Sequence, residues 1–104
     1  MIIDEMRKIV EEFKKINPNF DDLVDEYLKK EIELFSKSLK DTIFFLDNAD
    51  EDSIVWTCTV WDSVSEHFKS KELIMHMEKC VYKYPSNKKI LEINLEYAKK
   101  ALNK

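Results

Sequence analysis

Seven acidic side chains gather in a stretch of the sequence that contains no lysine or arginine. The stretch runs from residue 41 to residue 68, and its acids are Asp41, Asp47, Asp50, Glu51, Asp52, Asp62 and Glu66. Carboxylates in such numbers can coordinate a cation, act as an acid and base pair, or attract a positively charged partner. The residue types around them decide which chemistry is favoured.

The run from Asp47 to Asp52 superficially resembles a calcium-binding loop. Such a loop needs a glycine at its sixth position and a bidentate glutamate at its twelfth. Those positions hold Asp52 and Cys58, and the chain contains no glycine. We therefore expect no calcium site.

Sulfur and imidazole ligands are also sparse. His76 and Cys80 lie four residues apart and could share a zinc ion with Cys58 or His67, but no paired Cys or His spacing marks a structural zinc site. No Ser-His-Asp or Cys-His arrangement has local support either. We expect no metal, no cofactor and no catalytic residue, and so no enzyme. Both cysteines are expected to be reduced, buried thiols.

The absence of glycine limits the fold as well. Average usage near 7% would give about seven glycines in a chain of 104 residues. Hairpin turns and phosphate-binding loops depend on glycine, because it accepts positive φ at little cost. Helices joined by Asn, Asp, Ser and Pro corners are favoured instead, and P-loop and dinucleotide-binding motifs are excluded.

Apolar residues recur at helical spacing in the first half of the chain. One stripe covers residues 2–16 and ends at the corner Asn17-Pro18-Asn19, after which Asn19 or Asp21 is the expected cap of the next helix. The two stripes are Ile2, Met6, Ile9, Phe13 and Ile16, and then Val24, Leu28, Ile32, Phe35 and Leu39. Residues 43–46 predict one or two further helical turns.

Residues 54–61 are ambiguous. They are rich in strand-favouring types and could form a hairpin with residues 42–46. Against this, apolar residues keep helical spacing beyond the segment, and a lone two-stranded hairpin is marginal in water. These residues are Ile54, Cys58, Trp61, Val64 and Phe68. We predict a helix and keep the hairpin as an alternative.

The C-terminal part predicts two more helices. Ser70 should cap the first, which Pro85 follows, and Ser86 or Asn87 should open the second. Their apolar faces are Leu73, Met77, Cys80, Val81 and Tyr84, and then Leu91, Leu95, Ala98 and Leu102. The sequence therefore predicts an all-α fold, a compact single-domain bundle of five or six short helices over residues 1–104, with a C-terminal end that resembles a helical repeat.

Charge is distributed unevenly around a net value of −4. Residues 1–68 hold seventeen acids and eight bases, whereas residues 69–104 hold four acids and nine bases. The basic part lacks the arginine forks that read phosphate and guanine, so we expect no nucleic-acid binding. The first residues carry acids where a secretory signal needs positive charge, and no apolar run could span a membrane. We expect a cytoplasmic protein that does not bind membranes.

Two interpretations of the acidic stretch remain. Asp50, Glu51 and Asp52 could simply complement the dipole at the start of a helix. Alternatively, the acids draw in a basic partner while desolvated aromatic rings hold the complex together. Trp61 is expected in the core, and Trp56, off the apolar stripe, is the preferred exposed anchor. The expected partner-binding residues are Asp47, Asp50, Glu51, Asp52, Trp56, Asp62 and Glu66.

In general character the whole chain resembles a bacterial immunity protein of the colicin or contact-dependent growth inhibition type. The resemblance is carried by the acids from Asp47 to Asp52, by Trp56, and by Asp62 and Glu66. It implies a one-to-one complex with a cognate toxin domain, a basic ribonuclease or other nuclease, whose active site or substrate groove is covered. It leaves open the oligomeric state and whether the helix bearing Asp21, Asp22, Asp25 and Glu26 docks instead.

A second resemblance supports an alternative function. The stretch from Tyr82 to Asn87 is similar to the proline-marked junction between tetratricopeptide repeats, as are the residues that follow it, Ile90, Leu91, Tyr97, Ala98 and Leu102. This implies a helical adaptor that binds a peptide or protein partner. An array of this kind needs about three repeats of 34 residues, and the first half of the chain does not reproduce the pattern.

Overall fold

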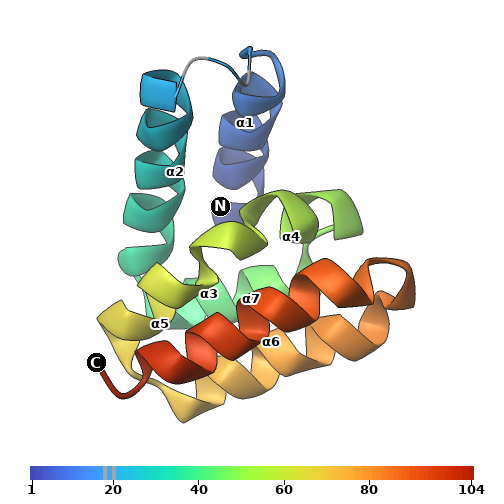
Figure 1. Ribbon diagram of the computed structural model, residues 1–104. Coiled ribbons are helices and arrows are strands. Elements are labelled where there is room, and N and C mark those ends of the chain that lie inside the picture. Colours follow the sequence, from blue (N-terminus) through green and yellow to red (C-terminus); the bar gives the residue numbers. More distant parts are fainter. Residues whose placement is uncertain (18, 20) are drawn as a thin grey trace.

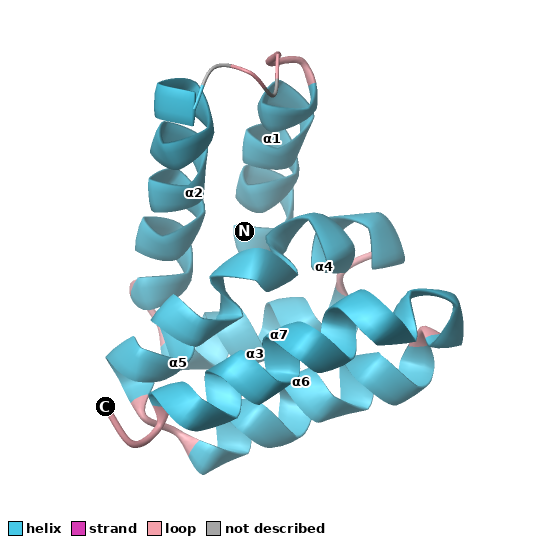
Figure 2. Ribbon diagram, in the orientation of Figure 1, coloured by secondary structure: helices cyan, strands magenta, loops and turns pink. Residues whose placement is uncertain are grey.

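Every regular element in the described part of the chain is a helix. The computed structural model describes residues 1–17, 19 and 21–104, without the side chain of Asp21. The α-helices are α1 (Ile2–Lys14), α2 (Asp21–Ser36), α3 (Leu39–Asn48), α4 (Glu51–Thr57), α5 (Trp61–Phe68), α6 (Lys71–Lys83) and α7 (Lys88–Ala101), and two 3-10 turns are η1 (Cys58–Val60) and η2 (Pro85–Asn87). Figure 2 shows no strand among these residues, which confirms the all-α prediction.

The ambiguous segment is helical. Residues 54–61 lie in α4, η1 and the first residue of α5, and residues 42–46 lie in α3, so the hairpin alternative is wrong. α4, η1 and α5 follow one another without a loop and form a bent rod, which we call the α4–α5 rod. Counted as one helix, it gives six helices in the described residues, as predicted. The Thr57 hydroxyl donates to the Ser53 carbonyl at 2.8 Å, and this kind of back-bonding often bends helices.

Two helical hairpins pack around the rod. Figure 1 shows α1 and α2 as one antiparallel pair and α6 and α7 as another, which crosses the first, with the rod between them. The rod contacts α1 through α4 and α7 through α5, and α3 packs against α6. The resulting molecule is compact, with a Cα radius of gyration of 12.8 Å. Its most deeply buried large side chains include Met6, Phe45, Ile54, Trp61, Leu73, Met77 and Leu91.

Serine and aspartate caps fix the corners. The Ser70 hydroxyl accepts from the Leu73 backbone N–H at 3.2 Å, as predicted for the start of α6. Ser38 caps α3 in the same way, and for this reason the second helix ends at Ser36 instead of continuing to Leu39 as its apolar stripe suggested. The predicted cap of α2 by Asn19 or Asp21 lies at a corner where residues 18 and 20 and the side chain of Asp21 are outside the described part of the chain, so it stays a prediction.

Lys69, which follows α5, has a left-handed backbone with φ 48° and ψ 48°. This position after a helix usually holds glycine, because other residues pay about 1–2 kcal/mol for the conformation. A chain without glycine fills it with lysine. None of the described helices combines the length and hydropathy that a membrane crossing would require.

Candidate functional site

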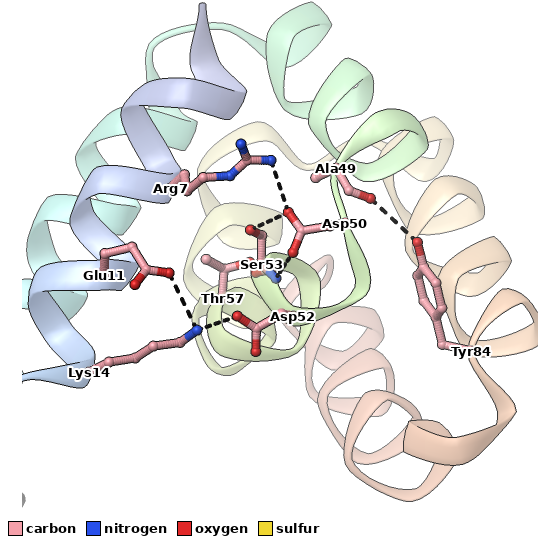
Figure 3. Close-up of polar contacts among 9 residues, drawn as sticks. All are labelled: Arg7, Glu11, Lys14, Ala49, Asp50, Asp52, Ser53, Thr57 and Tyr84. Carbon is pink, nitrogen blue, oxygen red and sulfur yellow. Dashed lines mark hydrogen bonds and ion pairs between the residues drawn. The ribbon is translucent and has the colours of Figure 1, made fainter.

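The first half of the acidic stretch is tied into the fold. Asp50 caps α4 by accepting hydrogen bonds from the Ser53 backbone at 3.2 Å and the Ser53 hydroxyl at 2.7 Å, and Arg7 of α1 lies 3.4 Å from the same carboxylate (Figure 3). Partial burial opposes ionisation, yet the hydrogen bonds from Ser53 and Arg7 outweigh it and hold the pKa of Asp50 below its ordinary value. Asp50 is therefore a structural cap as well as a charge.

Glu51 and Asp52, the two residues that follow Asp50, also contact side chains from distant segments of the chain. Lys14 of α1 pairs with Asp52, and that hydrogen bond raises the pKa of Lys14 (Figure 3). The Asn87 amide donates to the Glu51 carboxylate at 2.5 Å. Glu51 and Asp52 stand in the first turn of α4, where the helix dipole favours acids. These positions agree with the dipole-complementing interpretation for the start of this helix.

Asp47 also has a partner. Its carboxylate lies 2.7 Å from Nδ1 of His76 on α6, which makes an ion pair when the imidazole is protonated. Arg7 and Lys14 of α1 therefore face two acids, Asp50 and Asp52, that have no base near them in the sequence. The negative charge of residues 47–52 is compensated in part in space, which corrects the sequence-based view of an uncompensated block.

The two tryptophans lie in different surroundings. Trp61 is 1% exposed, as predicted for a core residue. Trp56 is only partly exposed: its ring packs edge-on against Phe13 with centroids 5.5 Å apart, and Lys14 Nζ lies 5.6 Å from its centroid. It fastens α4 to α1, so it is not the freely exposed anchor that the sequence suggested.

Asp62 and Glu66 differ from the other predicted residues. Both lie on α5, where Glu66 is exposed and Asp62 is partly exposed. Neither makes an ion pair in the described part of the chain. The structure therefore separates the seven predicted residues into a supporting group of five, on α3, at the cap of α4 and along α4, and a pair of free carboxylates on α5.

Sequence reasoning missed an apolar stripe on α7. Ile90, Ile93 and Tyr97 are 40%, 54% and 53% exposed, although the opposite face of the helix fills the core with Leu91, Leu95 and Ala98. The sequence did contain a signal, because α7 carries apolar residues on two faces and a single helix can bury only one of them against a small core.

A buried carboxyl was missed as well. Glu31 of α2 is 0% exposed, and neither of its carboxyl oxygens has a hydrogen-bond partner among the described residues. Burial raises its pKa to about 8. The predicted stripe of α2 passed through Ile32, which is only partly buried, and excluded Glu31 because it is charged. Its spacing from Leu28 and Phe35 could have placed it on the buried face.

The thiols are chemically quiet. Cys58 and Cys80 are buried and unpaired with each other, as predicted, and burial raises the pKa of each to about 11. A thiol in this state is a poor nucleophile and a poor metal ligand at neutral pH. No group of three His, Cys, Asp or Glu side chains in the described ranges is arranged to hold a metal ion. Comparison of the chain with protein-family models, with curated proteins and with solved structures found no match.

Proposed function

We propose that this chain is an immunity protein that binds a cognate toxin domain with a basic surface, such as a nuclease, and blocks its active site or substrate groove. The observation that supports the proposal is the pair of free carboxylates, Asp62 and Glu66, on a rod without a lysine or arginine of its own. A nuclease must be basic where it contacts phosphates, so an acidic protein surface can compete for the same groups.

The rod that carries these carboxylates is held from both sides. Arg7 and Lys14 attach its first half to α1, and the Ser65 hydroxyl donates to the Ala98 carbonyl of α7 at 2.7 Å. A helix whose backbone is fixed before binding loses less conformational freedom when the complex forms. In this proposal Asp47, Asp50 and Asp52 support the surface, and Asp62 and Glu66 meet the partner.

The test is titration with a basic toxin domain, taken from a toxin gene where one adjoins this gene, by calorimetry and by stopped-flow kinetics. Changing Asp62→Ser and Glu66→Ser together should slow association about tenfold at low ionic strength, because electrostatic steering is lost. The matched control changes Asp22→Ser and Asp25→Ser, two exposed acids on α2. An unchanged association rate for the α5 pair and a slowed rate for the α2 pair would move the docking surface to α2.

The same titration distinguishes the adaptor alternative. In its favour, α6 and α7 pack against each other on either side of η2, which contains Pro85, as at a junction between helical repeats. Tight binding of a linear peptide with no binding of the folded toxin domain would support that alternative over the immunity function.

A further inference from the structure

Ile90, Ile93 and Tyr97 form one continuous stripe. Their spacing of three and then four residues puts them on the same face of α7, and each is at least 40% exposed. Single exposed apolar residues are common, but a row of three large ones on one helix face marks an interaction surface more often than chance exposure. We call this row the α7 stripe.

α7 runs beside the α4–α5 rod in the same direction, as Figure 1 shows. Four hydrogen bonds join the rod and the residue after it to η2, α7 and the chain end, in order: Glu51 with Asn87, Cys58 with Asn94, Ser65 with Ala98, and Lys69 with Lys104. The order of these pairs fixes which sides of the two helices meet.

The free carboxylates lie along the outer side of this contact. On α5, Trp61 and Val64 point into the core and Ser65 faces α7, so helical spacing places Asp62 and Glu66 on the side away from the core. On α7, Asn94 and Ala98 face the rod, and Ile90 and Tyr97 come next on the outer side. Acids of α5 and apolar residues of α7 therefore border each other.

Charged residues of both signs mark the other edge of the stripe. Lys89, Lys100, Glu92 and Glu96 are exposed and lie on α7 beyond Ile93, on the side away from the rod. The surface thus has three bands in order: carboxylates on α5, apolar side chains in the middle, and a mixed band of lysines and glutamates on α7. We call the first two bands the α5–α7 surface; its residues are Asp62, Glu66, Ile90, Ile93 and Tyr97.

We infer that the α5–α7 surface is the docking face for the toxin domain, which presents an apolar group to Ile93 and Tyr97 and lysine or arginine side chains to Asp62 and Glu66. The inference rests on the proposed function, and it adds the residues that hold the complex together after charge has brought the partners into contact. Charge complementarity favours the α5 side of the stripe for basic groups of the partner, because Asp62 and Glu66 lie on a rod without lysine or arginine, whereas the far edge mixes lysines with Glu92 and Glu96.

The bands predict different kinetic effects. Desolvated aromatic and aliphatic anchors near the centre of an interface slow dissociation, whereas charges at its edge mainly change association. Ile93→Ser with Tyr97→Ser should therefore raise the Kd about a hundredfold through faster dissociation. Lys89→Ser with Lys100→Ser should speed association, opposite in sign to the change at Asp62 and Glu66 and smaller, because Glu92 and Glu96 already offset these two charges.

The experiment is surface plasmon resonance with the toxin domain of the titration above and the full-length variants. The control is Met75→Ser with Tyr82→Ser, which removes two side chains of α6 that are 61% and 75% exposed and should leave the Kd unchanged. Thermal melts of each variant establish that it is folded, which is expected because every changed side chain is exposed.

The binding experiment distinguishes a failure of the proposed function from a failure of this inference alone. If the natural chain does not bind the toxin domain, the proposed function is wrong and this inference with it. If the natural chain binds but Ile93→Ser with Tyr97→Ser binds equally tightly, the proposed function stands and the α5–α7 surface is not the docking face. A free protein that sediments as a dimer and becomes a monomer in the same variant would show that a second copy covers the stripe, which also overturns the inference.

Discussion

Replacement of Glu31 by glutamine should stabilise this protein, although it removes a charge from a highly charged chain. Glu31 is 0% exposed, its carboxyl oxygens have no partner among the described residues, and burial raises its pKa from 4.5 to about 8. A glutamine of nearly the same shape is neutral at every pH. The substitution therefore isolates the cost of ionising this one group.

The size of the effect follows from the two pKa values. Below pH 4.5 the carboxyl is protonated in both the folded and the unfolded chain, so ionisation costs the fold nothing. Between 4.5 and about 8 the unfolded chain releases a proton that the folded chain keeps, and the free energy of unfolding falls by about 1.4 kcal/mol per pH unit. The loss reaches about 3 kcal/mol at pH 7 and stops growing above about pH 8. That is a large share of the 5–15 kcal/mol typical of a domain.

The assay is urea unfolding followed by circular dichroism, for the natural chain and for Glu31→Gln at several pH values. The two proteins should have similar stability near pH 4.5, and Glu31→Gln should be more stable by about 3 kcal/mol at pH 7. Glu33→Gln is the matched control, because Glu33 is exposed on the same helix and should leave the pH dependence of the natural chain unchanged.

Parallel pH profiles for the natural chain and Glu31→Gln would refute the reasoning. They would mean that the carboxyl is ionised inside the fold, held by a partner or by water. Carbon-13 NMR of the glutamate carboxyls gives an independent check, since one resonance should titrate near pH 8 while those of exposed glutamates titrate at ordinary values.

Two further predictions concern the backbone and the thiols. Lys69→Gly should raise the free energy of unfolding by about 1 kcal/mol, because glycine adopts the left-handed conformation without strain. A decrease in the urea midpoint would contradict the left-handed backbone at Lys69. The control is Lys79→Gly, in the middle of α6, which should lower the free energy of unfolding by about 1 kcal/mol. A thiol reagent at neutral pH should leave Cys58 and Cys80 unmodified in the folded protein and modify both in urea, whereas rapid labelling of folded protein would show that burial or the raised pKa is wrong.

Most of the fold could be predicted from the sequence because each helix repeats its buried positions at helical spacing. The stripe through Ile54, Cys58, Trp61 and Val64 identified a helix despite strand-favouring residue types, and all four side chains are buried. The bend at η1 could not be predicted, since it depends on how the two halves of the rod pack against α1 and α7. The cap at Ser70 was predictable because it is local chemistry.

The candidate site was harder to predict because charge compensation is not local. Arg7 and Lys14 lie about forty residues from Asp50 and Asp52 in sequence, and only the packing of α1 on α4 brings them together. Helical spacing alone places Glu31 on the buried face of α2, and Ile93 and Tyr97 on a second face of α7. Residue type points the other way in both places, because a glutamate is typical of the surface and large apolar residues are typical of the core.

The corners closed without glycine have a consequence for the unfolded ensemble. Glycine gives a denatured chain more backbone conformations than any other residue, and replacing one where the native backbone allows it stabilises by about 0.4–1 kcal/mol. A chain that lacks the roughly seven glycines of an average sequence therefore loses less conformational entropy when it folds. This raises its free energy of unfolding by about 3 kcal/mol or more. This gain in the free energy of unfolding is of the same size as the loss that results from keeping Glu31 neutral at pH 7. The restricted denatured state therefore helps this small fold retain a buried acid.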